Sequence, residues 1–238
     1  MSTNAVGHAP RRTLALAARV SVHWLWLAGG FVLSFAVPFV VADLLALQRD
    51  VYYGILATAV VALLLAWARS TQYDLRRAAK RHWFLAAGLG LALAGVLAVM
   101  VVRTEDATPR PDGIELVAAV LWRGVVYGAT DGLLLSVFPI LIVFAAFAGT
   151  RLRERLTGNL LIGVIALVAS LAMTATYHAG YSDFRSEKIA KPVQGDVAWS
   201  IPTLVTLNPI GAPLAHVGLH VSAVLHSYET DTFLPPHE

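Results

Sequence analysis

The chain contains no cysteine, and only 14% of its 238 residues are charged. The first absence excludes disulfide bonds and thiolate metal ligands, so any metal site must use histidine and carboxylate side chains. The scarcity of charge argues against a separate soluble domain of ordinary composition. The 18 basic residues fall in short clusters between apolar runs, so the net charge of +3 does not indicate a nucleic-acid partner.

Apolar residues are abundant instead. They make up 57% of the chain, and the mean hydropathy is +0.66, values typical of a polytopic membrane protein. Runs near or above the length that crosses a bilayer occupy residues 22–42, 51–68, 83–102, 114–149, 159–177 and 199–228. We therefore expect an all-α bundle of about six transmembrane helices, in contact with membrane lipids and forming a single domain over residues 1–238.

Two of these runs are irregular. Residues 114–149 would form a helix of about 54 Å, which exceeds the bilayer, so this run must tilt strongly, break or begin along the surface. Residues 208–213, with the sequence NPIGAP, carry two prolines and a glycine that interrupt a simple helix. We expect a short apolar arm at 200–207, a break, and a helix from about Ala212, which makes the last helix a broken one.

Basic residues indicate the orientation. They cluster in residues 11–19, 69–81 and 151–155, whereas the alternate loops carry acids that include Asp183 and Asp196. By the positive-inside rule the three clusters are cytoplasmic. Six crossings then place both termini in the cytoplasm, and we expect a bacterial plasma membrane.

Two stripes of residues run along positions 121–132, which read LWRGVVYGATDG. Arg123, Tyr127 and Asp131 form a polar stripe, and Gly124, Gly128 and Gly132 form a glycine stripe beside it. The glycine pattern lets a neighbouring helix approach closely. Arg123 and Asp131 can form an internal ion pair, with a partner or through Tyr127, that locks helix packing. Alternatively, Arg123 orients a substrate carbonyl or phosphate.

Three histidines suggest a metal site. His216 and His220, in PLAHVGLHV, project from one face of a helix, and His178 ends the fifth apolar run. Three protein ligands and an open position are the usual arrangement of catalytic zinc. Asp183 could serve as a ligand, a hydrogen-bond partner of a ligand, or a base. Packing of the histidines in a polar core, or haem binding, would give the same pattern.

The order of these motifs resembles that of the CPBP (CAAX-protease and bacteriocin-processing) intramembrane metalloproteases. That family has a Glu-Glu-x-x-x-Arg motif, a Phe-x-x-x-His motif and a His-x-x-x-Asn motif on separate helices. The resemblance implies that Arg123 is the motif arginine and that His178 and His216 are the motif histidines. This chain departs from the family at the two glutamates, the phenylalanine and the asparagine, which are replaced by Ala118, Ala119, Thr174 and His220.

The chain is also similar to the seven-helix hydrolases typified by alkaline ceramidases and adiponectin receptors. These hold zinc with three histidines, using a Ser-x-x-x-His motif, an aspartate and a late His-x-x-x-His. The matching residues here are Thr174, His178, Asp183, His216 and His220. Threonine stands in place of the serine. Both resemblances imply metal-assisted hydrolysis near a membrane.

The sequence thus predicts a membrane-embedded hydrolase that acts on a peptide or lipid substrate. Zn²⁺ would be bound by His178, His216 and His220 and would lower the pKa of a bound water to about 7. Asp183 or Glu115 would act as general base, and Arg123 would stabilise the developing oxyanion. The alternative is a non-catalytic polytopic protein, either a small transporter or a pseudoenzyme scaffold, in which these residues serve packing.

Overall fold

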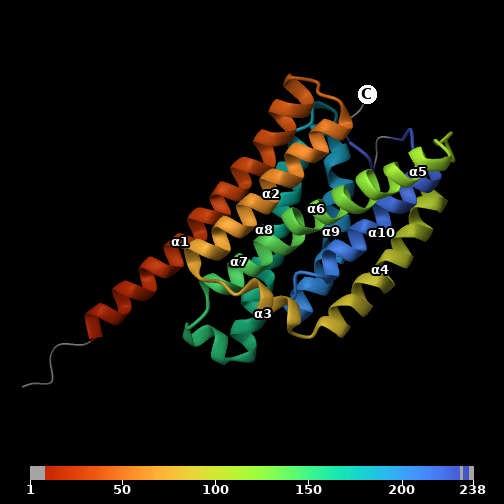
Figure 1. Cartoon of the computed structure of the whole chain (residues 1–238). Coiled ribbons are helices and arrows are strands. Elements are labelled where there is room, and N and C mark those ends of the chain that lie inside the picture. The colour runs from red at the N-terminus through yellow and green to blue at the C-terminus, as the bar shows by residue number, and fades with distance from the viewer. Residues whose placement is uncertain (1–8, 231–232, 236–238) are drawn as a thin grey trace, which may run out of the picture.

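The computed structural model describes residues 9–230 and 233–235, with side chains from residue 20 onward. Every element of this part is helical (Figure 1). Five helices are long and apolar enough to cross a membrane: Val20–Leu44, Arg49–Thr71, Trp83–Thr104, Gly113–Ala146 and Leu156–Ala179. The predicted all-α membrane bundle is confirmed. The side chains of the first basic cluster, at residues 11–19, lie outside the described part.

The first three crossings follow the predicted runs closely. α1 (Ala9–Val37) continues into the π-helical segment η1 (Pro38–Leu44), and α2 (Arg49–Thr71) returns beside it. The short α3 (Leu75–Lys80) leads to α4 (Trp83–Thr104).

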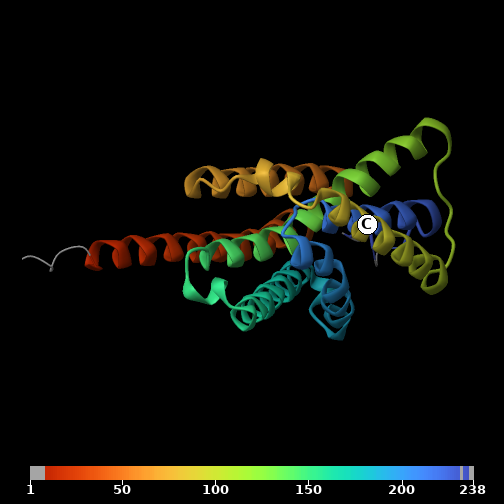
Figure 2. The same ribbon diagram turned by 90° about the horizontal axis from the view of Figure 1, so that it is seen from below.

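The long fourth run is one continuous helix, referred to below as the long helix. It consists of α5 (Gly113–Ala119), η2 (Val120–Val126), α6 (Tyr127–Asp131), η3 (Gly132–Val137) and α7 (Phe138–Ala146). Two π-helical segments flank α6, and such segments are frequent at functional sites. The run is the most buried of the five candidate spans. Figure 2 shows α2 and α8 (Leu156–Ala179) on opposite sides of α1 and α7.

The last part of the chain forms two helices that run in opposite directions. After η4 (Arg151–Glu154) and α8, the short turns η5 (Ser182–Phe184) and η6 (Glu187–Ile189) lead to α9 (Ala190–Thr206) and α10 (Gly211–His226). The break falls between them, near the predicted place. The predicted apolar arm at 200–207 is, however, the final part of a 17-residue helix.

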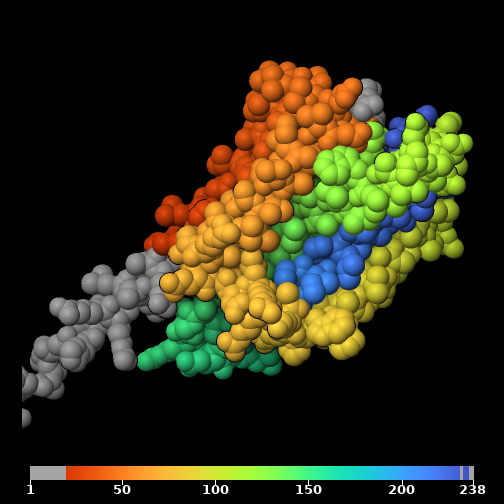
Figure 3. Space-filling model, viewed as in Figure 1, coloured from red at the N-terminus to blue at the C-terminus, as the bar shows by residue number. Residues whose placement is uncertain are grey.

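Asn208 fixes the turn between α9 and α10. Its buried side-chain nitrogen lies within 3.1 Å of the carbonyl oxygens of Ala78, Ala79 and Arg81, which precede α4, and shares its two protons among them. At the other end of α10, the carbonyl oxygen of His226 accepts a hydrogen bond from Thr108, which follows α4. α10 therefore runs parallel to α4 along its whole length. Figure 3 shows α10 between the long helix and α4, with part of it visible at the surface.

The ends of the described chain consequently lie at opposite ends of the bundle (Figure 1). α1 begins at the end that carries the basic loops 69–81 and 151–155, and α10 finishes at the other end. This arrangement differs from the prediction that both termini share one side. The reason is α9, whose first residues, including KPVQGD at 191–196, are too polar to register as an apolar run.

The glycine stripe is a tight helix contact, as predicted. A Cβ atom added to Gly128 would lie 2.9 Å from the carbonyl oxygen of His216, and one added to Gly132 would lie 2.6 Å from the Cα atom of Pro213. Gly124 lies similarly close to Val221. The backbone of the long helix thus packs directly on α10, and this contact holds the histidines of α10 beside α6.

Candidate metal centre

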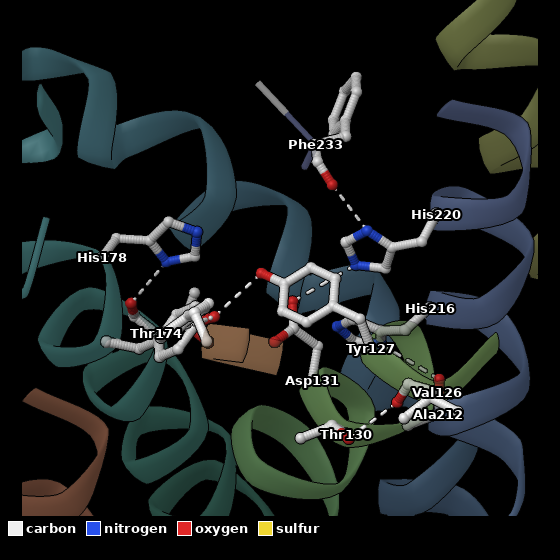
Figure 4. Close-up of polar contacts among 12 residues, drawn as sticks. Val126, Tyr127, Thr130, Asp131, Thr174, His178, Ala212, His216, His220 and Phe233 are labelled. Carbon is white, nitrogen blue, oxygen red and sulfur yellow. Dashed lines mark hydrogen bonds and ion pairs between the residues drawn. The ribbon is translucent and has the colours of Figure 1, made fainter. Parts of the chain in front are cut away.

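The three predicted histidines lie around α6, and all three are buried. His178 is in the last turn of α8, and His216 and His220 follow each other on one face of α10, with ring centroids 6.5 Å apart. Figure 4 shows the three rings arranged around Asp131 and Tyr127 of α6. Helices distant in the sequence thus bring these side chains into one polar cluster.

Each of the three imidazoles is oriented by a backbone carbonyl oxygen (Figure 4). Nδ1 of His178 lies 2.8 Å from the carbonyl oxygen of Thr174. Nδ1 of His216 lies 3.1 Å from that of Ala212. Nδ1 of His220 lies 2.7 Å from that of Phe233. A carbonyl oxygen can only accept, so each Nδ1 carries the proton. In a neutral ring Nε2 then presents its lone pair, which is the tautomer that metal-binding histidines adopt.

Asp131 supplies negative charge to the same cluster. Its Oδ2 atom lies 3.3 Å from Nε2 of His220. The Oδ1 atom of Asp131 and the Nε2 atoms of His216 and His220 are buried, and none of the three has a hydrogen-bond partner among the described residues. Polar atoms left in this state are costly, so each of them calls for a partner such as water or an ion.

The cluster is not a closed set of metal ligands. Within the described residues, no three His, Asp or Glu side chains are grouped closely enough to hold a metal ion between them. The three histidines and Asp131 nevertheless provide nitrogen and oxygen donors of the kind that zinc accepts. Zinc binding through His178, His216 and His220 therefore stays a prediction.

A network of tyrosine hydroxyls, which the sequence did not reveal, borders the cluster. The Tyr177 hydroxyl lies 3.0 Å from that of Tyr52, 2.9 Å from that of Tyr127 and 2.8 Å from that of Tyr181. The ring of Tyr127 meets His220 at 4.7 Å between centroids. Burial raises the pKa of the Tyr181 hydroxyl, so it stays protonated and can donate a hydrogen bond.

The predicted catalytic side chains lie away from the histidines. Arg123 forms a two-pronged ion pair with Asp50 of α2, with both N–O distances 2.8 Å. Glu115 is exposed in the first turn of α5, roughly 24 Å along the helix axis from Asp131. Asp183 is exposed in η5. Their catalytic roles stay predictions, and Asp131 is the carboxylate that the fold brings to the histidines.

A second buried carboxylate, Asp196, lies between α8, α9 and η3. The prediction that it belongs to an outer loop is wrong, because it is fully buried within α9. Its oxygen atoms lie 3.0 Å from Ser136 Oγ, 2.9 Å from Ser170 Oγ and 3.3 Å from Ser200 Oγ. The spacing of Asp196 and Ser200, four residues apart on one face of a helix, was the available signal.

No family model, curated protein or solved structure matches the chain. The resemblance to the CPBP metalloproteases therefore stays a prediction that rests on the order of three motifs. The geometry of the buried polar cluster is therefore the basis for proposing a function.

Proposed function

We propose that the protein is a metal-dependent hydrolase embedded in the bacterial plasma membrane, related to the CPBP proteases and acting on a peptide or lipid substrate. We place the basic loops 69–81 and 151–155 in the cytoplasm, as the positive-inside rule requires. The observation that carries the proposal is the arrangement of three buried imidazoles. Each has its Nδ1 atom on a backbone carbonyl, and all three surround one buried carboxylate.

The donor set fits Zn²⁺. His178, His216 and His220 would hold the ion through their Nε2 atoms, and Asp131 would lie beside it, with its Oδ2 atom 3.3 Å from Nε2 of His220. The unpartnered Nε2 of His216 and Oδ1 of Asp131 support this assignment, since buried polar atoms are normally satisfied. The π-helical segments on both sides of α6, the helix that carries Asp131, are also of a kind that is frequent at functional sites.

A zinc ion bound there would act as a Lewis acid and make water acidic enough to attack near neutral pH. Asp131 is positioned to take up a proton, because one of its oxygens has no hydrogen-bond partner among the described residues. Tyr127 and Tyr177 present hydroxyl groups at the edge of the same cluster and can donate to a developing negative charge. Arg123 forms an ion pair with Asp50, and we assign this arginine the role of holding the long helix against α2.

Elemental analysis of the purified protein tests the proposal. Wild type, prepared without chelators and then incubated with zinc, should retain about one zinc per chain. His178→Ala, His216→Ala and His220→Ala should each remove most of it, because each substitution removes one of three ligands. His226→Ala is the matched control, since the His226 Nε2 atom lies against the carbonyl oxygen of Glu105 outside the cluster. Wild type without metal after reconstitution would overturn the proposal.

The alternative is a non-catalytic membrane protein in which the cluster stabilises packing. The Asp131–His220 contact of 3.3 Å favours it, because it joins α6 to α10 and needs no bound group to do so. In that case none of the five proteins binds zinc, and the three cluster variants differ from the control only in a lower unfolding temperature.

A further inference from the structure

A groove of about 600 Å³ lies between α8 and α9, at the end of the bundle that carries the basic loops. Its polar rim is formed by Arg81, His82, Arg153 and Asn159. Its walls are apolar and include Leu160, Val164, Leu167, Val205 and Leu207. Leu160 and Val205 are more than 60% exposed, so the groove is open along the apolar surface of the bundle.

Arg153 is held in a fixed place at the rim. Its Nη1 atom donates to the Asn159 side-chain oxygen at 2.7 Å, and its guanidinium lies 5.0 Å from the centre of the Phe144 ring. The Asn159 side-chain nitrogen in turn donates to the backbone carbonyl oxygens of Arg153 and Arg155. A side chain ordered in this way loses little freedom when it binds an anion.

A second guanidinium lies near the first without a compensating charge. Burial and the positive charge of Arg81 together lower the pKa of Arg153. Among the described residues, neither arginine forms an ion pair with a carboxylate. The guanidinium groups of Arg81 and Arg153 therefore repel each other when the groove holds no anion. An anion bound between them would relieve this repulsion.

We propose that this groove binds an anionic phospholipid. The phosphate group would lie between Arg81 and Arg153, and an acyl chain would follow the apolar walls formed by α8 and α9. The pairing of a basic rim with an apolar groove at the same end of a membrane bundle is the pattern that recognises acidic lipids. This site is separate from the histidine cluster, and it requires neither metal nor catalysis.

Gly163 provides a direct test of the groove. It lines the groove, and a Cβ atom added there would meet nothing within 4 Å. Gly163→Leu should therefore fill the groove without disturbing the fold. Gly95→Leu on α4 is the matched control, because that glycine also faces open space but lies outside the groove.

The measurement is native mass spectrometry of the full chain in detergent, titrated with phosphatidylglycerol or with phosphatidylcholine. Wild type should bind phosphatidylglycerol in preference. Arg153→Gln and Arg81→Gln should each weaken this binding by about tenfold, because each removes a charged donor to phosphate. Gly163→Leu should weaken it similarly. Arg76→Gln, which removes the same charge from the exposed α3 outside the groove, and Gly95→Leu should leave it unchanged.

Three results would overturn the proposal. The first is equal binding of the two lipids by wild type. The second is an equal loss of binding in Arg76→Gln and Arg153→Gln, which would indicate a general effect of net charge. The third is displacement of the lipid by inorganic phosphate at equal concentration, which would show that the rim binds a free anion and that the groove contributes nothing.

Discussion

Asp196 is surrounded by more oxygen contacts than the neighbouring hydroxyl protons can bridge. Close oxygen–oxygen contacts join Asp196 to Ser136, Ser170 and Ser200, and also join Ser170 to Ser200 and to the carbonyl oxygen of Leu135. Three serines supply one proton each, so at most three of these five contacts can be hydrogen bonds. If the side chain at position 196 could itself donate to Ser170, a fourth contact would become a hydrogen bond. Ser170 would then be free to donate its own proton to the carbonyl oxygen of Leu135.

Asp196→Asn should consequently be well tolerated. Its amide nitrogen can donate to Ser170 while its oxygen accepts from Ser136, so we expect the free energy of unfolding to change by less than about 1 kcal/mol. Asp196→Leu should lower that free energy by about 2 to 4 kcal/mol, because buried hydroxyl groups lose their acceptor. Unfolding in detergent, followed by circular dichroism, measures both. Equal losses in the two variants would contradict this account.

Asp131 and the histidines allow a second test at single positions. If Asp131 takes up a proton in the reaction, Asp131→Asn should retain zinc but lose hydrolytic turnover by a factor of about 10² or more, the usual contribution of a general base. Zinc content and turnover of one preparation measure this. Loss of zinc together with turnover would identify Asp131 as a ligand instead of a base.

The sequence indicated the three histidines but not the side chains that surround them. His216 and His220 are visible because their spacing of four residues places them on one face of a helix wherever that helix lies. Tyr52 reaches the neighbouring tyrosine network from α2, and no local spacing reports that contact, because Tyr177 lies 125 residues further along the chain. The partner of Arg123 was hidden for the same reason, since Asp50 precedes it by 73 residues.

At the scale of helices, the glycine stripe determines how the long helix meets α10. Gly128→Leu should separate the two helices, because its side chain would overlap the backbone of His216 and Val217. Overpacking of a tight core contact costs about 1 to 3 kcal/mol, and a clash with backbone atoms lies at the upper end of that range. We expect a loss of about 3 kcal/mol in detergent.

Gly88→Leu on α4 is the control for that experiment, because a Cβ atom there meets nothing within 4 Å. It should leave stability equal or slightly higher, since leucine favours helix more than glycine does. Zinc content should fall in Gly128→Leu alone if the contact also positions His216. A stable Gly128→Leu protein would show that α10 can repack without cost.

The length of the apolar runs in the sequence predicted most of the helices, but it predicted neither α9 nor the π-helical segments. The first five runs lie within or largely within the observed helices, because a bilayer demands continuous apolar sequence there. α9 carries Asp196, Ser200 and Thr203 on a face that packs inside the bundle, so its polar residues lowered the apolar signal. The π-helical segments carry no such signal, because they depend on the packing around α6.

At the scale of the whole molecule, the opposite directions of α9 and α10 decide where the chain ends. α9 starts where α8 finishes, and it returns to the basic end, where Asn208 bonds to the segment before α4. α10 then runs back beside α4.

If the basic loops are cytoplasmic, reporters at the N-terminus and after Leu156 should be cytoplasmic. A reporter inserted near Glu187 and one fused to the C-terminus should both be outside. The C-terminal fusion is the discriminating measurement, because a single broken crossing over residues 199–228 would return that reporter to the cytoplasm. A cytoplasmic C-terminal signal together with an outer signal at Glu187 would therefore show that α9 and α10 do not each cross the membrane.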